Sequence, residues 1–193
     1  MGEPCLDQRP LAGVNRIEVV DPFPSYMAAN PREELYQKKD THWDEPGIEI
    51  AAQVIGDSVN RFFGGRGDAL YAFKDTFVYK PRDLALFRKD STSYANACRM
   101  VSEPDGTRYR DSIWSDILIF GDSYFLVNYG YGGGIGPEIA RYTGRPNFTI
   151  GHIGFNYGAP SEMWNFVKNR RKVPKVLVWV FVSRFFLFKI EPL

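Results

Sequence analysis

Three short apolar segments in the second half of the chain constrain its fold more than any other feature. These segments are Ile117–Phe120, Phe148–Ile150 and Val176–Val182. The first and the last are continuously apolar, and the middle one is interrupted only by Thr149; such runs are typical of strands buried on both faces of a parallel sheet. A stretch ending at Gly144 separates the first two, and a predicted helix over Ser161–Arg171 separates the last two. This order predicts an α/β fold with a mostly parallel central sheet.

Ligand sites in open parallel sheets form just beyond the carboxyl ends of the strands. The residues that follow Phe120, Ile153 and Val182 are therefore the first places to look for chemistry.

The first half is less regular. Apolar residues at helical spacing predict a helix over Gly47–Phe63, which Gly64-Gly65 ends. The remaining expectations for this half are an irregular arm over residues 1–30 with a short strand at Arg16–Val20, a helix near Asp83–Phe87 and a turn at Pro104-Asp105-Gly106. At 193 residues the chain has the length of one domain, which we place at residues 31–193.

Charge and composition exclude several classes of protein. A net charge of +1 gives no electrostatic reason to expect nucleic-acid binding. No apolar run reaches the roughly 18 residues of a membrane span, and no signal peptide is visible. Cys5 and Cys98 either pair in an oxidising compartment or are ordinary core residues. Residues 124–193 carry 9 basic and 3 acidic side chains, so we hypothesise a basic wall beside the site.

Gly121-Asp122-Ser123 directly follows the first apolar segment. A serine at a glycine-permitted turn from strand to helix is in a nucleophile's position, because backbone N–H groups at a helix N-terminus favour a developing oxyanion. The alternative is a turn with a helix N-cap. The same triplet recurs as Gly56-Asp57-Ser58 inside the predicted helix, where Ser58 is interpreted as a helix-face serine.

A serine nucleophile needs a base, and the chain has only two histidines. His42 lies two residues after Asp40, and in an extended segment these two side chains point the same way, so the carboxylate can orient the ring. His152 follows a predicted strand, and no aspartate follows Asp122. A metal site would require both histidines without supporting spacing, and an exposed polar loop is the other alternative.

No cofactor is expected. The glycine-rich segment Gly130–Gly136 lacks both the dinucleotide spacing and the Lys-Ser/Thr ending of a phosphate-binding loop, so we predict a mobile loop beside the nucleophile.

Three blocks of sequence, in this order, resemble the SGNH-hydrolase-like domain of the alginate O-acetylation proteins of the AlgJ/AlgX type. The blocks are Asp40-Thr41-His42-Trp43 with Gly47 and Ala51-Ala52, then Asp116–Phe120 leading into Gly121-Asp122-Ser123-Tyr124, and Pro174–Trp179 leading to Arg184. In that family Asp-x-His precedes the serine, which fits the lack of aspartate after Asp122. The resemblance implies a three-layer α/β/α SGNH-like (flavodoxin-like) fold.

The resemblance also implies roles for individual residues. Ser123 would be the nucleophile, His42 the general base and Asp40 its orienting carboxylate. Gly158 is the first candidate for the residue that helps form the oxyanion hole, and Asn156 and Gly154 are the next candidates. The substrate-binding candidates are Tyr124 and Arg184; Arg184 stands near the position where ordinary SGNH enzymes have an asparagine, and it could instead brace the site or cap the sheet edge.

The expected function is serine-dependent O-acetyl transfer to or from a carbohydrate, with transferase favoured over esterase. The implied partners are a polysaccharide or sugar acceptor, an acetyl donor and a membrane-bound protein that supplies acetyl groups; the implied location is periplasmic or extracellular. Family members usually carry further sequence before the Asp-x-His-Trp block, so this chain would be a piece or a compact relative. The alternative is a non-catalytic carbohydrate-binding or assembly protein, for which His42 would lie far from Ser123.

Overall fold

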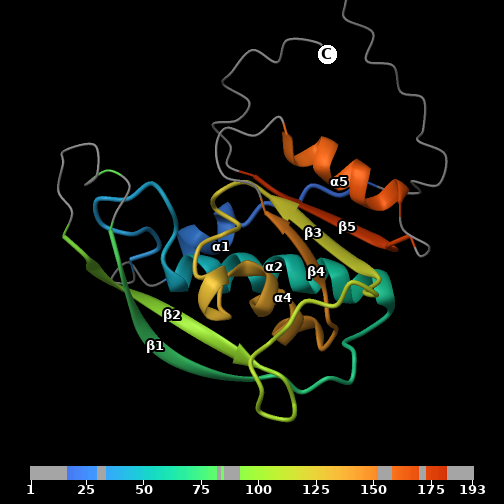
Figure 1. The fold of residues 1–193 in the computed structure, drawn as a ribbon, viewed down its shortest axis with the longest axis horizontal. Helices are drawn as coiled ribbons and strands as arrows, with labels where there is room; N and C mark the ends of the chain where they lie inside the picture. The colour runs from blue at the N-terminus through green and yellow to red at the C-terminus, as the bar shows by residue number, and fades with distance from the viewer. Residues whose placement is uncertain are drawn as a thin grey trace, which may run out of the picture.

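The computed structural model describes residues 17–29, 34–81, 84, 92–151, 158–169 and 173–181 (Figure 1). Its elements are α1 (Phe23–Ala28), α2 (Glu45–Phe63), β1 (Ala72–Lys80), β2 (Tyr94–Ser102), β3 (Ile117–Gly121), the 3-10 helix η1 (Tyr129–Tyr131), α4 (Ile135–Thr143), β4 (Phe148–Gly151), α5 (Gly158–Lys168) and β5 (Val176–Val180). The described residues form a mixed α/β structure, as the sequence predicts, but they form two sheets where one was expected. No helix within these ranges is both long enough and apolar enough to span a membrane.

The three predicted strands form one parallel sheet in the order β4-β3-β5. Ile119 in the central strand pairs with Thr149 on one side and Val178 on the other. All five residues of β3 are buried, which explains its continuously apolar sequence. In Figure 1, α5 lies on one side of this sheet and α2 on the other. The predicted parallel pairing is confirmed.

The main core lies between α2, α4 and the central strand. It includes Ile48, Ala51 and Ala52 of α2, Ile117 and Ile119 of β3, and Phe125, Ile135 and Ile139. The predicted helix is confirmed, but it begins two residues earlier, at Glu45. Asp44 caps the helix by accepting a bond from the Glu45 N–H at 3.0 Å, and Pro46 is tolerated in a first turn. Gly64 ends it in the left-handed conformation, at φ 74°.

Strands β1 and β2 form a separate antiparallel pair with nine matched positions, from Ala72↔Ser102 to Lys80↔Tyr94. This hairpin extends past α2 and α4 (Figure 1). The sequence predicts no strand here, because one face of β1 is wholly exposed and the strand lacks a clear alternation of apolar and polar residues. Phe77 and Tyr79, for example, are both largely exposed.

Several local expectations need correction. The N-terminal arm is not irregular throughout, because Phe23–Ala28 forms α1, with Pro22 at its N-cap and Pro24 in its first turn. Residues 17–20 do not form the predicted strand, and Arg16 lies outside the described residues. Of the helix expected near Asp83–Phe87, only Leu84 is described. The turn at Pro104-Asp105-Gly106 is confirmed, with Gly106 at φ 82°.

The outer edge of β4 is covered by the segment around Asp111. Its carboxylate accepts a bond from the Thr149 backbone N–H at 2.8 Å, and others from the Thr149 hydroxyl and, at 3.1 Å, from the Tyr129 hydroxyl. The next residue, Ser112, donates its N–H to the Asn147 carbonyl at 2.9 Å. Burial raises the pKa of Asp111, and the hydrogen bonds that it accepts oppose this shift. A side chain and a backbone amide thus occupy the place of a neighbouring strand.

Candidate active site

Asp40 and His42 lie in a tight turn just before α2. The turn is closed by a bridge between Tyr36 and Trp43 and by the Gln37 N–H, which donates to the His42 carbonyl at 3.0 Å. One Asp40 oxygen accepts the His42 backbone N–H at 3.0 Å and lies 2.6 Å from ring Nδ1. The expected pairing is present, but the extended conformation from which we argued for it is wrong. A turn is needed because the same oxygen reaches both the backbone and the ring.

Ser123 follows β3 at a close approach of two backbones. A Cβ at Gly121 would lie 2.4 Å from the Val180 carbonyl oxygen, so no larger residue fits there without a shift. The Asp122 side chain is buried and accepts the Tyr124 N–H at 2.9 Å, which shapes the turn. Ser123 is therefore held at the carboxyl end of the central strand, as predicted.

The segment after Ser123 differs from the expected helix. Successive turns run to Asn128, with bonds of the i to i+3 type such as Leu126 N–H to the Ser123 carbonyl at 3.1 Å. Asn128 then takes a left-handed conformation at φ 61°, which an α-helix cannot include. The glycine-rich segment Gly130–Gly136 is not a simple loop either. It spans the end of η1 and the start of α4, and most of it is buried.

The three predicted catalytic side chains form one continuous line of hydrogen bonds. His42 Nε2 lies 2.9 Å from Ser123 Oγ, and the opposite ring nitrogen lies 2.6 Å from the Asp40 carboxylate. The Asp40 side chain is 6% exposed and that of His42 is 18% exposed. We assign the ring proton to Nδ1, because a carboxylate can only accept there. Nε2 is then the acceptor for the serine hydroxyl proton, which is the arrangement of a serine nucleophile with an oriented base.

Tyr124 and Trp43 pack around this line. The Trp43 indole N–H donates to the Tyr124 carbonyl at 2.9 Å, and the Tyr124 hydroxyl donates to the Thr41 carbonyl. The Tyr124 ring lies 4.9 Å from the His42 ring, centre to centre. Tyr124 is 8% exposed. Its role in substrate binding stays a prediction, and in this structure its hydroxyl already has a backbone partner.

The remaining predicted residues are only partly described. Gly158 is the first residue of α5. Asn156, Arg184 and His152 lie outside the described residues, as does Gly154. The oxyanion and substrate-binding roles of these residues therefore stay predictions.

Two buried polar residues near the site, Asn128 and Glu45, belong to no motif that could be recognised in the sequence. Asn128 is 4% exposed, and its amide N–H groups donate to a Glu45 oxygen at 3.1 Å and to the Ala97 carbonyl at 3.0 Å. Glu45 is 6% exposed, and burial raises its pKa to about 7. The carboxylate of Glu138 adds to this upward shift, while hydrogen bonds from Asn128 and from Arg99 oppose it. Glu45 is thus a buried carboxyl group that lies only three residues after His42 in the sequence.

Other reactive groups are few within the described ranges. No group of three or more His, Cys, Asp or Glu side chains there could hold a metal ion. Cys98 is a buried free thiol whose pKa is raised by burial to about 12, whereas Cys5 lies outside those ranges.

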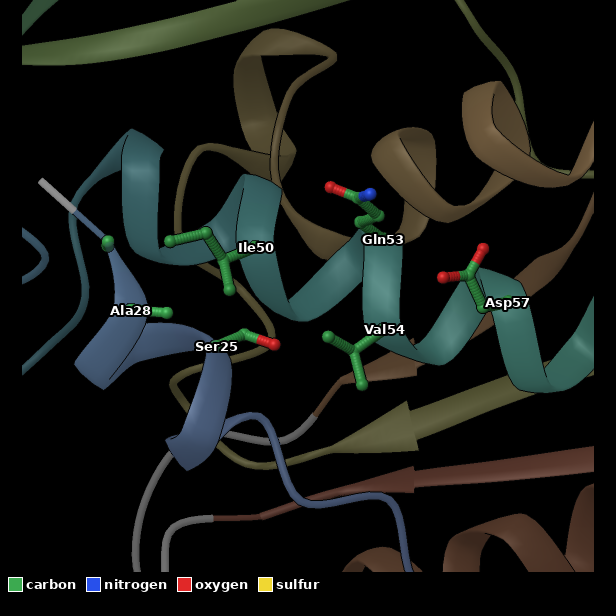
Figure 2. Close-up of a pocket in the computed structure, with 7 residues that line it drawn as sticks. Ser25, Ala28, Ile50, Gln53, Val54 and Asp57 are labelled. Carbon is green, nitrogen blue, oxygen red and sulfur yellow. The ribbon is translucent and has the colours of Figure 1, made fainter.

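A groove of about 420 Å³ lies elsewhere, between α1 and α2. Figure 2 shows Ser25 and Ala28 of α1 facing Ile50 and Val54 of α2, with Gln53 and Asp57 at its margin. It contains none of the predicted site residues.

No protein-family model and no curated protein matches the sequence. Among solved structures, the O-acetyltransferase domain of Pseudomonas putida AlgJ superposes with a TM-score of 0.67 and 20% identity, over 89% of this chain and 61% of that one. Pseudomonas aeruginosa AlgX gives a TM-score of 0.56 and 19% identity, over 79% of this chain and 37% of that one. This chain thus spans less than two thirds of either protein. The predicted resemblance to AlgJ/AlgX-type domains is confirmed as a likeness of fold.

Proposed function

We propose that this protein is a serine-dependent O-acetyltransferase that acts on a carbohydrate. The hydrogen-bonded line Asp40–His42–Ser123 carries the proposal, because a base 2.9 Å from a hydroxyl is what an acyl-transferring serine requires. The likeness to an O-acetyltransferase domain supports acetyl as the transferred group.

In the first half-reaction, Ser123 Oγ bonds to the carbonyl carbon of an acetyl donor while its proton moves to His42 Nε2. The negative charge that develops on the carbonyl oxygen would be held by backbone N–H groups, for which Ser123 and Gly158 are the candidates. The bond to the donor's leaving oxygen then breaks, and that oxygen takes the proton from the imidazolium. Asp40 stabilises the charged ring during both proton transfers.

The second half-reaction repeats these steps with a sugar hydroxyl. His42 takes the proton of the incoming hydroxyl, the sugar oxygen bonds to the acetyl carbon, and Ser123 leaves with a proton returned by the ring. Water in place of the sugar would give an esterase. We favour the transferase because the similar AlgJ domain is described as an O-acetyltransferase.

The finer architecture and setting belong to the same proposal. Helices α5 and α2 on opposite sides of the parallel sheet support a three-layer SGNH-like arrangement over residues 31–193, preceded by an N-terminal arm (Figure 1). By analogy, we place the protein in the periplasm or outside the cell, with a polysaccharide acceptor and a membrane-bound protein that supplies acetyl groups.

The alternative is a carbohydrate-binding or assembly protein on the same fold. It would not need a base beside Ser123, and the 2.9 Å separation between His42 and Ser123 therefore favours the enzyme.

Turnover of a chromogenic acetyl ester tests the first half-reaction. We expect Ser123→Ala and His42→Ala to lower turnover by at least about 10³-fold, since the residues of such a triad act as a unit. The chain offers a matched control in Ser58, which belongs to the second Gly-Asp-Ser triplet and donates to Glu18 on the surface of α2. Ser58→Ala should retain full turnover. Equal turnover in the Ser123 and Ser58 variants would refute the proposal.

The acceptor is tested in the same assay. Addition of an unacetylated oligosaccharide should accelerate release of the chromophore and yield an acetylated sugar detectable by mass spectrometry. Release of acetate alone, at an unchanged rate, would identify an esterase instead.

A further inference from the structure

Two reciprocal hydrogen bonds join the segment that carries the base to the segment that carries the nucleophile. The Trp43 indole N–H donates to the Tyr124 carbonyl at 2.9 Å, and the Tyr124 hydroxyl donates to the Thr41 carbonyl. The bonded residues are 81 and 83 positions apart in the chain. In each case a side chain from one segment binds the backbone of the other, so the bonds fix the two backbones relative to one another.

These bonds flank the catalytic contact on both sides. Thr41 and Trp43 are the neighbours of His42, and Tyr124 is the neighbour of Ser123. The contact between His42 Nε2 and Ser123 Oγ, 2.9 Å long, joins the same two segments. By contrast, the bond between Asp40 and His42 lies within one segment, so nothing from the other segment is needed to form it.

Packing adds to the constraint. Trp43 and Tyr124 are 7% and 8% exposed, and their rings meet edge to face with centres 5.7 Å apart and planes at 68°. The Tyr124 ring also packs against the His42 ring, at 4.9 Å and 43°. The imidazole therefore has an aromatic wall that limits how far it can swing from the serine.

We propose that Trp43 and Tyr124 are positioning residues that hold His42 Nε2 within hydrogen-bond reach of Ser123 Oγ. This inference rests on the proposed function. The two residues act on the distance between base and nucleophile, and leave the pairing of His42 with Asp40 intact. A misplacement of about 1 Å can lower a catalysed rate by about 10²-fold. Loss of either bond should therefore lower the rate of acetyl transfer even where the protein still folds.

Tyr124→Phe is the sharpest variant, because it removes one hydroxyl and keeps the ring against His42. We expect kcat for the acetyl ester to fall about 10- to 100-fold with KM little changed. Trp43→Phe removes the other donor and should act in the same direction. Tyr142→Phe is the matched control. Tyr142 lies on α4, and its hydroxyl donates to Glu49 at 3.1 Å. Removal of this hydroxyl should leave kcat unchanged.

A double-mutant cycle separates positioning from a direct role in binding or folding. If Tyr124 acts through His42, then Tyr124→Phe should cause no further loss in the His42→Ala background. A loss of the same factor in both backgrounds would overturn the proposal, as would unchanged kcat in the single variant.

A second readout does not depend on activity. The chain has only two histidines, so the imidazole ¹⁵N signals of His42 can be followed by NMR. Ser123→Ala should shift the Nε2 signal in the wild-type background, because the contact is lost, and should shift it much less in the Tyr124→Phe background, where the contact is already loosened. The Nδ1 signal should keep the signature of its bond to Asp40 in every variant.

The outcomes distinguish the two proposals. Turnover that is insensitive to Ser123→Ala refutes the proposed function and leaves the NMR comparison as the test of positioning. An equal Nε2 shift in the wild-type and Tyr124→Phe backgrounds refutes positioning, whatever the turnover.

Discussion

Glu45 makes the folded protein sensitive to pH. Glu45 is 6% exposed, and burial raises its pKa from 4.5 to about 7. One of its oxygens accepts from Asn128 at 3.1 Å, and the desolvation of the carboxyl group outweighs this bond and the one from the Arg99 backbone. Between these two pKa values the folded state therefore holds a proton that the unfolded state has lost.

The sign and size of the effect follow from this difference. Because the folded state binds more protons, the free energy of unfolding falls as pH rises from about 4.5 to about 7 and is level on either side. At 1.36 kcal/mol for each unit of pKa, the total is about 3 kcal/mol. Glu45→Gln is neutral at every pH and retains an oxygen for Asn128. It should therefore gain about 3 kcal/mol relative to the wild type between pH 4 and pH 8.

Urea denaturation at several pH values measures this gain. The comparison between variant and wild type cancels contributions from buried carboxyl groups that do not interact with Glu45, such as Asp111, whose pKa burial also raises. Glu34→Gln is the control, since Glu34 is exposed and pairs with Lys38 on the surface, at 2.6 Å. Parallel stability curves for Glu45→Gln and the wild type across this range would refute the reasoning.

Three further predictions concern packing and reactivity. Phe125→Ala empties a fully buried position and should lower the free energy of unfolding by about 3 to 5 kcal/mol in urea; a loss below about 1 kcal/mol would contradict this core. Gly121→Ala places a methyl group 2.4 Å from the Val180 carbonyl and should lower both Tm and serine-dependent turnover; wild-type values would show that the backbones are not in contact. In a Cys5→Ser chain, Cys98 should resist a disulfide reagent at pH 8 until urea unfolds the protein, because its pKa is raised to about 12; rapid reaction without urea would contradict its burial.

The parallel sheet was predictable because its central strand, β3, is buried along its whole length and β5 is continuously apolar, although Leu177 and Trp179 of β5 are exposed. The helix over Gly47–Phe63 was predictable for a similar reason, since its apolar positions repeat at helical spacing. The β1–β2 hairpin was not, because its first strand is mostly exposed. Exposed strands carry little periodic signal.

The candidate site shows the same division. Ser123 could be found from the triplet after a strand, and His42 and Asp40 from their spacing and the resemblance. The turn that brings Asp40 to the ring could not, because it depends on a bridge between Tyr36 and Trp43. Asn128 and Glu45 could not be found either, since their contact joins residues 83 positions apart.

The covered edge of β4 bears on how the protein behaves at high concentration. An open strand edge offers unpaired amides to any other chain, and such pairing leads to aggregation. Here the Thr149 amide is bonded to the Asp111 carboxylate, and the Asn147 carbonyl to the Ser112 amide. An incoming strand would have to displace both bonds and bury a carboxylate against its own backbone. On this side, the sheet is thereby protected from growing into an intermolecular one.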